Sequence, residues 1–104
     1  MTADAPLTGQ RILIFVGDIY EDLELWYPKL RMIEAGAQVT LAGPKADTVY
    51  SGKHSYPCRS DASIAEVNAS DFNGLIVPGG FMPDQLRRDP KVLQLVRDFS
   101  DAGK

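Results

Sequence analysis

The chain has 104 residues, of which 44% are hydrophobic and 24% are charged, and its formal net charge is −3. This size allows one domain at most, and these proportions are those of an ordinary globular protein. The acidic balance argues against a nucleic acid or an anionic membrane surface as the main partner, and no apolar run approaches the roughly 18 residues of a membrane span.

The chain contains a single cysteine, Cys58, so no disulfide can form within it. Residues 1–10 lack the basic start and apolar core of a signal peptide, which together with the lone cysteine favours a reducing, cytoplasmic setting. We expect a flexible tail over residues 1–10, followed by one domain over residues 11–104.

The first half of the chain has the pattern of a βαβ unit. Residues 11–16 are a nearly continuous apolar run, which is typical of a parallel strand covered on both faces. Over residues 21–35 the apolar period becomes that of a helix, whose expected apolar face is Leu23, Trp26, Leu30 and Ile33. Pro28 inside this pattern predicts a kink or a late helix start. Residues 39–42 predict a second strand, reached by a right-handed crossover.

The second half predicts smaller elements. Residues 48–61 suggest an antiparallel hairpin standing off the main sheet. The S-x-x-E spacing at 63–66 is that of a capping box and predicts a short helix. Residues 75–77 predict a buried strand. A last helix follows the cap and first-turn proline at 89–90, and its apolar face is Val92, Val96 and Phe99.

These elements predict an α/β domain with a mostly parallel sheet. After the last helix such a sheet normally returns as another buried strand, and none follows here. Residues 12–16 and 75–77 are apolar on both faces, as central strands are, and need strand partners and cover. We therefore expect the N-terminal portion of one domain, which depends on the remainder of that domain and is not a self-sufficient enzyme.

The strand over residues 75–77 ends in Pro78-Gly79-Gly80. Two glycines at the carboxyl end of a strand leave backbone N–H groups with no side chain to block a ligand, which is how an open α/β sheet cradles an anion or oxyanion. An oxyanion cradle needs an attacking group within about 3 Å of the same point. No serine or cysteine here has the strand-to-helix setting of a nucleophile elbow, so an ordinary turn remains an alternative.

Acidic residues follow the first strand. Glu21 and Glu24 lie one helical turn apart, so both carboxylates can point toward the carboxyl edge of the sheet. A carboxylate held there among apolar neighbours could share a proton with a nucleophile. The alternative is that acids are simply favoured in the first turn of a helix.

Other chemistries are less well supported. His54 and Cys58 lie four residues apart and could share one face of a strand, but no orienting partner is evident, and we expect Cys58 to be non-catalytic. Two lone ligands are too few for a structural zinc site, and we expect no metal. Neither a G-x-G-x-x-G nor a phosphate-loop motif is present, and we expect no cofactor. A receiver-like module would use Asp18 or Asp22, but Pro78-Gly79-Gly80 occupies the place of its phosphoacceptor.

Five motifs occur in one order: Tyr20-Glu21-Asp22-Leu23-Glu24-Leu25, Tyr27-Pro28, Ser51-Gly52-Lys53-His54, Val77-Pro78-Gly79-Gly80 and Pro83-Asp84. In this order and spacing the chain, from about residue 11 to 104, resembles the PfpI (intracellular protease I) family of the ThiJ/PfpI superfamily, which is related to class I glutamine amidotransferases. The resemblance implies a flavodoxin-like three-layer α/β sandwich. It also implies a cysteine nucleophile on a strained A-x-C-H-G elbow, directly followed by a histidine. That elbow would come just after residue 104, and it is absent here.

The resemblance assigns three roles. Glu24 is the first choice for the acidic partner of the cysteine, and Glu21 is the second. Gly79 and Gly80 match the glycines on the oxyanion side. Asp84 matches an acid that reaches across a subunit interface toward the neighbour's catalytic histidine, although aspartate is one methylene shorter than the family's glutamate.

For the complete domain, the resemblance implies a cysteine-dependent hydrolase, peptidase or glyoxalase/deglycase-type enzyme acting on small carbonyl compounds, glycated adducts or peptides. The main alternative is a non-enzymatic stress- or redox-sensing member of the superfamily. We also expect a homo-oligomer whose contacts run through residues 81–88, where Phe81 and Met82 are large apolar residues in a loop, and through the hairpin around His54.

Overall fold

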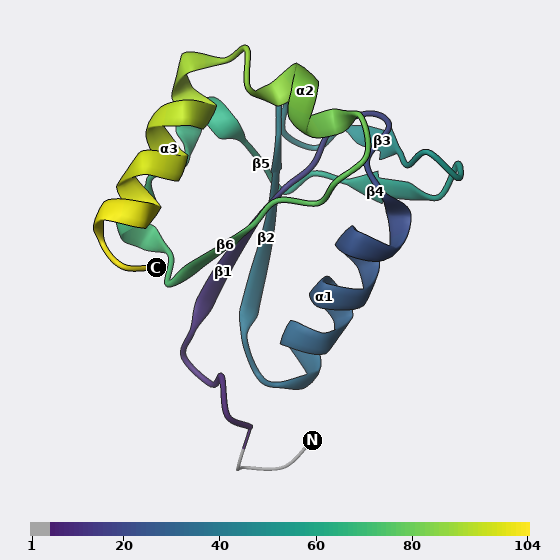
Figure 1. The fold of residues 1–104 in the computed structure, drawn as a ribbon. Helices are drawn as coiled ribbons and strands as arrows, with labels where there is room; N and C mark the ends of the chain where they lie inside the picture. Colours follow the sequence, from purple (N-terminus) through teal and green to yellow (C-terminus); the bar gives the residue numbers. More distant parts are fainter. Residues whose placement is uncertain (1–4) are drawn as a thin grey trace.

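In the computed structural model, which describes residues 5–104, four parallel strands form the main sheet in the order β5-β2-β1-β6 (Figure 1). The strands are β1 (Arg11–Phe15), β2 (Gln38–Gly43), β5 (Ala62–Ser63) and β6 (Gly74–Ile76). The helices α1 (Asp22–Glu34) and α3 (Pro90–Asp101) lie on opposite sides of this sheet. The predicted α/β class with a parallel sheet is confirmed.

The strand β1 is central because it pairs with β2 on one side and with β6 on the other. Leu13, Ile14, Phe15 and Val16 are fully buried, which explains the continuous apolar run in the sequence. The strand β6 is an edge strand within the described residues, and its side chains are only half-buried. Within residues 5–104, residues 75–77 therefore have a strand partner on one side only, and the second partner that we expect for them is not among the described residues.

The helix α1 runs from Asp22 through Pro28 to Glu34, so the predicted late start is wrong. The predicted inner face is wrong for three of its four residues, since only Trp26 packs against the core. Leu23, Leu30 and Ile33 are 73%, 57% and 47% exposed, whereas Leu25 is fully buried. The buried residues of this helix are Asp22 and Leu25, and Asp22 contacts the hairpin turn. Apolar periodicity marks a face of a helix, but it does not say what covers that face.

The predicted hairpin is confirmed as β3 (Val49–Ser51) and β4 (Pro57–Arg59), an antiparallel pair separate from the main sheet. The predicted helix at 63–66 is only the 3₁₀ turn η1 (Ile64–Glu66), and a second such turn is η2 (Ala69–Asp71). The Ser63 hydroxyl donates to the Glu66 carboxylate at 2.9 Å and does not cap the turn backbone, so the expected capping box is not formed.

The last helix, α3, begins as predicted, because the Asp89 side chain accepts a hydrogen bond from the Lys91 amide at 2.9 Å. Val92 and Phe99 are buried, but Val96 is 41% exposed and Leu95 takes its place in the core. A short helix, α2 (Met82–Leu86), precedes α3 and was not predicted.

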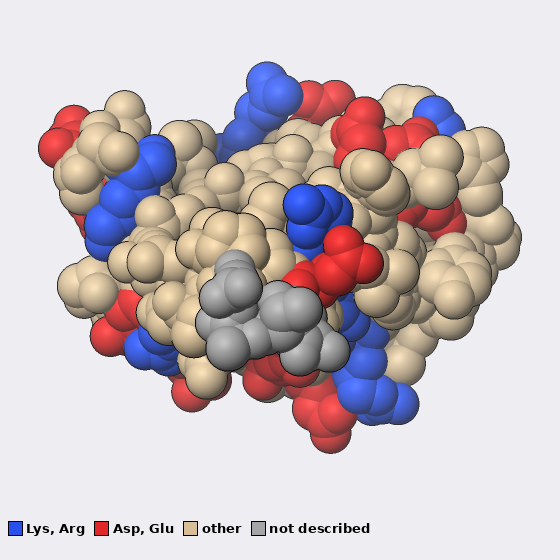
Figure 2. All heavy atoms as spheres, turned by 90° about the horizontal axis from the view of Figure 1, so that it is seen from below, with Lys and Arg blue, Asp and Glu red and all other residues tan. Residues whose placement is uncertain are grey.

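Part of the predicted tail lies outside the described residues. Residues 5–10 form turns, and the Leu7 amide donates to the Ala35 carbonyl at 2.8 Å, beside the end of α1. The face shown in Figure 2 carries Lys and Arg side chains interspersed with Asp and Glu, and no patch of a single charge covers it. Among the described residues no helix is long and apolar enough to cross a membrane.

Candidate active site

Three loops meet at the carboxyl edge of the sheet, and backbone hydrogen bonds join them. In the loop after β1, the Ile19 amide donates to the Ser51 carbonyl at 2.8 Å, which ties this loop to the hairpin. The Ile19 carbonyl accepts from the amides of Phe81 and Met82 at 3.0 and 3.3 Å, which ties it to the glycine loop after β6. The site is therefore assembled largely by main-chain contacts.

Glu24 lies in the first turns of α1 and contacts the glycine loop. The Gly79 amide donates to Glu24 Oε1 at 2.6 Å. A Cβ at position 79 would lie only 2.5 Å from that oxygen, so any larger residue there would displace the Glu24 carboxylate from this position. The structure thus brings together the first-choice acid and one of the two predicted glycines.

The second glycine has a different role from the first. Gly80 has φ +88°, and a Cβ there would lie 2.6 Å from the Ile19 carbonyl oxygen. Because Glu24 already engages the Gly79 amide, the Gly80 amide is the donor of the pair that has no acceptor among the described residues. A cradle for a developing negative charge would therefore depend on Gly80 more than on Gly79.

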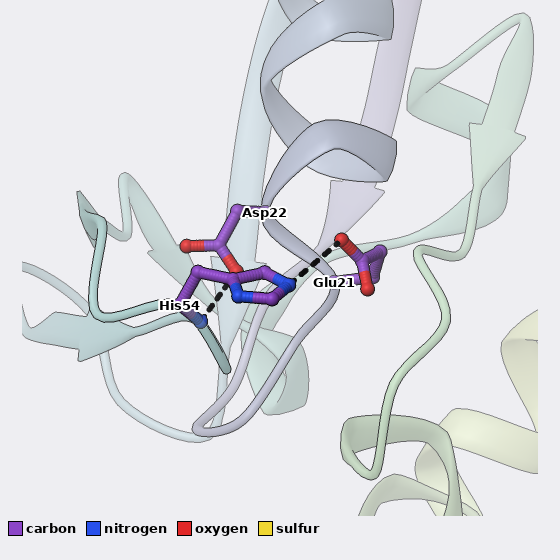
Figure 3. A group of neighbouring side chains, drawn as sticks. All are labelled: Glu21, Asp22 and His54. Atoms are coloured by element: carbon purple, nitrogen blue, oxygen red, sulfur yellow. Dashed lines mark hydrogen bonds and ion pairs between the residues drawn. The ribbon is translucent and has the colours of Figure 1, made fainter.

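Glu21 faces another loop. Its Oε2 lies 3.1 Å from Lys53 Nζ. Its Oε1 lies 3.9 Å from His54 Nε2, as Figure 3 shows. Its side chain is only 19% exposed. The expectation that Glu21 and Glu24 point the same way is therefore wrong, since Glu24 contacts the glycine loop and Glu21 contacts the hairpin turn. Of the two carboxylates, only that of Glu24 contacts the glycine loop.

Asp22 holds the hairpin turn in place. Its two carboxylate oxygens accept the backbone amides of His54 at 2.9 Å and Tyr56 at 3.0 Å. Burial of Asp22 acts to raise the pKa of its carboxyl, but the two amides outweigh that effect and hold the pKa below its ordinary value. A Cβ at Gly52 would collide with this carboxylate. Asp22 is thus a structural brace between α1 and the hairpin.

Glu21, Asp22 and His54 bring three ligand atoms within 4.8 Å of one another (Figure 3). Two features oppose a metal ion there. Both oxygens of Asp22 are occupied by amides, and the Lys53 ammonium already neutralises Glu21. The protein's own donors therefore fill the place that a cation would take.

The structure does not bring His54 and Cys58 together as a pair. The His54 side chain is 67% exposed and lies beside Glu21, whereas Cys58 is buried on β4 opposite Tyr50. Burial raises the pKa of the Cys58 thiol, which disfavours the reactive thiolate.

Asp84 lies in α2 and is not part of the Glu24–Gly79 contact. Its carboxylate pairs with the Arg87 guanidinium at 2.9 Å, and the Asp84 side chain is 67% exposed. A role across an interface would require this ion pair to open or to be shared.

From the sequence no role was assigned to two residues of this edge, Tyr20 and Ile19. Tyr20 is fully buried, its hydroxyl donates to the Tyr56 carbonyl at 2.6 Å, and it accepts from Trp26 Nε1 at 3.2 Å. Ile19 has φ +62°, a conformation that no sequence pattern indicates for isoleucine. Tyr20 could have been found as an aromatic residue directly preceding the acids, whereas Ile19 offered no signal.

Comparisons with known proteins agree with this geometry. The model of the DJ-1/PfpI family matches residues 10–104. A deglycase of Pyrococcus abyssi is 36% identical over 94 residues, which cover 90% of this chain and 56% of that protein. General stress protein 18 of Bacillus subtilis is 38% identical over 92 residues, which cover 88% of this chain and 54% of that protein.

A solved structure gives the same result for the fold. A two-domain protein of Anabaena variabilis with DJ-1/ThiJ/PfpI-like and ferritin-like domains has a TM-score of 0.88 and 29% identity, over 91% of this chain and 28% of that one. The chain spans about half the length of the curated relatives it matches. The family match, the parallel sheet and the Glu24–Gly79 contact at its carboxyl edge agree, and the chain belongs to the DJ-1/PfpI family.

Proposed function

We propose that this chain supplies the acid and the backbone amides of a cysteine-dependent active site that acts on small carbonyl compounds, glycated adducts or peptides. The observation that carries the proposal is the 2.6 Å hydrogen bond from the Gly79 amide to Glu24 at the carboxyl edge of the sheet. It fixes one oxygen of the carboxylate and leaves the other free to face a reacting group. Relatives named deglycases support a carbonyl adduct as substrate.

The nucleophile in this proposal comes from sequence outside these 104 residues. Cys58 is the chain's one cysteine, it is buried on β4, and burial raises the pKa of its thiol. An incoming thiol beside Glu24 would share its proton with the free carboxylate oxygen. As sulfur bonds to the carbonyl carbon, the electron pair of the C=O bond moves to oxygen, where the Gly80 amide stabilises the charge.

Glu24→Gln tests this role in the complete protein. The amide keeps the size of the side chain but cannot take a proton, so we expect kcat/KM to fall about 100-fold or more. Turnover is measured with methylglyoxal, a glycated peptide and a fluorogenic peptide. Glu34→Gln, at the far end of α1 and 74% exposed, is the matched control and should leave turnover unchanged.

The second candidate is a stress- or redox-sensing protein without turnover. The similarity to a general stress protein favours it. A complete wild-type protein that turns over none of the three substrates would refute the enzyme and leave the sensor. Equal rates for wild type and Glu24→Gln would instead keep an enzyme but remove Glu24 from its mechanism.

We also propose that the protein self-associates through residues 81–88 and the hairpin turn. Phe81 and Tyr56 are 64% and 56% exposed, which supports both parts of this surface. Met82 does not contribute to this surface, because it is fully buried. Its side chain packs against Gly17 so closely that a Cβ added there would lie 3.1 Å from it. Asp84 lies on the same surface and could reach a neighbouring subunit if its pair with Arg87 opens.

A further inference from the structure

Ile19 is in an unusual conformation for its residue type. Its φ is +62°, in the left-handed region that branched side chains rarely adopt. Two other non-glycine residues share a positive φ, Asp47 and Ser55, and both are short polar residues in turns. Among the described residues Ile19 is the one branched aliphatic residue forced into this region.

The hydrogen bonds of the Ile19 backbone explain its left-handed conformation. They do not explain why the residue is an isoleucine. Its amide and carbonyl bind the hairpin and the glycine loop, and its carbonyl lies against Gly80. Glycine or asparagine would make the same main-chain contacts with less strain. The choice of isoleucine is therefore not explained by these hydrogen bonds.

Packing does not explain the isoleucine either. The residue is 40% exposed, whereas Tyr20 beside it and Val16 before it are fully buried. Both the left-handed backbone and the partial exposure disfavour an isoleucine at this position. Residues in such strained conformations gather at functional sites. Ile19 also borders Gly80, because its carbonyl oxygen lies 2.6 Å from the position that a Cβ on Gly80 would take.

We propose that the Ile19 side chain contacts the substrate and selects carbonyl compounds that carry an alkyl group next to the reacting carbon. The inference rests on the proposed carbonyl chemistry and deepens it. The Gly80 amide would hold the carbonyl oxygen, and Ile19 would form an apolar wall for the neighbouring alkyl group. A substrate without that group would gain nothing from the contact.

The kinetic test compares methylglyoxal with glyoxal, which differ by one methyl group, in the complete protein. Wild type should favour methylglyoxal, and Ile19→Gly and Ile19→Asn should lower the ratio of the two kcat/KM values several-fold, mainly through KM. Both variants relieve strain, so Tm should stay the same or rise. Ile33→Ala, at an exposed position on α1, is the control and should leave the ratio unchanged.

A second measurement does not depend on turnover. Ile δ1-methyl NMR during titration with hydroxyacetone should shift the Ile19 signal and leave Ile33 unmoved. A methyl shift without turnover would keep the binding role and reject the enzyme. Normal turnover with an unchanged substrate ratio would overturn the role of Ile19 and keep the enzyme. A large fall in Tm for both Ile19 variants would also overturn it, because the side chain would then be buried by other sequence or by another subunit.

Discussion

Asp22 shows how one buried carboxylate can connect two parts of a site without taking part in its chemistry. Its two oxygens accept the amides of His54 and Tyr56, so the hairpin turn is held against the first turn of α1. The same turn of α1 carries Glu24. Displacement of Asp22 would therefore disturb the hairpin turn and the acid together.

The lowered pKa of Asp22 gives a pH dependence of stability with a definite sign. Because the folded state holds this pKa below its ordinary value of 3.8, the contribution is complete well above that pH and is lost as pH falls through the folded pKa. Asp22→Asn should lower the free energy of unfolding at neutral pH, since an amide has one oxygen for two amide donors. The difference from wild type should shrink below about pH 4.

Urea unfolding between pH 2 and pH 7 measures that difference. Asp47→Asn is the control, because the Asp47 side chain is 85% exposed and pairs only with Arg59. A difference that stays constant down to pH 2 would contradict the stabilising role of the ionised carboxylate.

Cys58 gives a prediction about catalysis. Its thiol is buried on β4 and its pKa is raised by that burial, so a serine there should leave kcat/KM of the complete protein within about two- to threefold of wild type. The same change should lower the free energy of unfolding by about 1–3 kcal/mol, because it buries a hydroxyl. Steady-state kinetics and urea unfolding check the two parts. A Cys58→Ser protein that is folded and inactive would show that the thiol is the nucleophile.

The helix α1 has two faces with different energetic weight. Leu25 is fully buried in the core, whereas Leu30 is 57% exposed. Leu25→Ala should cost about 2–5 kcal/mol of unfolding free energy. Leu30→Ala should change it by no more than about 0.5 kcal/mol. Chemical denaturation of both variants measures the contrast. If Leu30→Ala proves as costly as Leu25→Ala, sequence or a subunit beyond the described residues covers this face.

This helix also shows what the sequence could and could not predict. Its span and type followed from apolar spacing, because a helix must repeat every 3.6 residues. Its buried side did not follow, because the apolar stripe at Leu23, Leu30 and Ile33 was assumed to face the sheet. The stripe that packs contains Asp22, whose burial depends on amides donated by a hairpin about 30 residues away.

The candidate site was predictable where motifs lie next to strand ends, and it was not where backbone conformation decides. The acids after the first strand and the glycines after β6 could be placed at the same sheet edge because both follow strand ends, whereas the choice of Glu24 over Glu21 came from the resemblance to the PfpI family. The separation of Glu21 from Glu24 depends on the position of Lys53 in a hairpin turn. The left-handed Ile19 arises from three loops meeting at one residue, and local propensity opposes it.

The proposed self-association concerns the complete protein. Light scattering should give the mass of a dimer or a higher oligomer. The variant Phe81→Asp should give a lower mass, because association would have to bury a charge at the contact. Ile33→Asp, on the outer face of α1, is the comparison variant. A wild-type monomer at all concentrations would reject the association and any role of Asp84 across an interface.

The loops at the carboxyl edge are joined by main-chain groups. The Glu21 amide donates to the Gly79 carbonyl, the Lys53 amide donates to the Tyr20 carbonyl, and Ile19 binds both neighbouring loops. Amides and carbonyls are the same in every residue except proline, so these links survive when side chains are exchanged. Proteins with different side chains at this edge can therefore keep the same backbone shape. The condition is that no Cβ is introduced at Gly79 and Gly80, which lie close to Glu24 and Ile19.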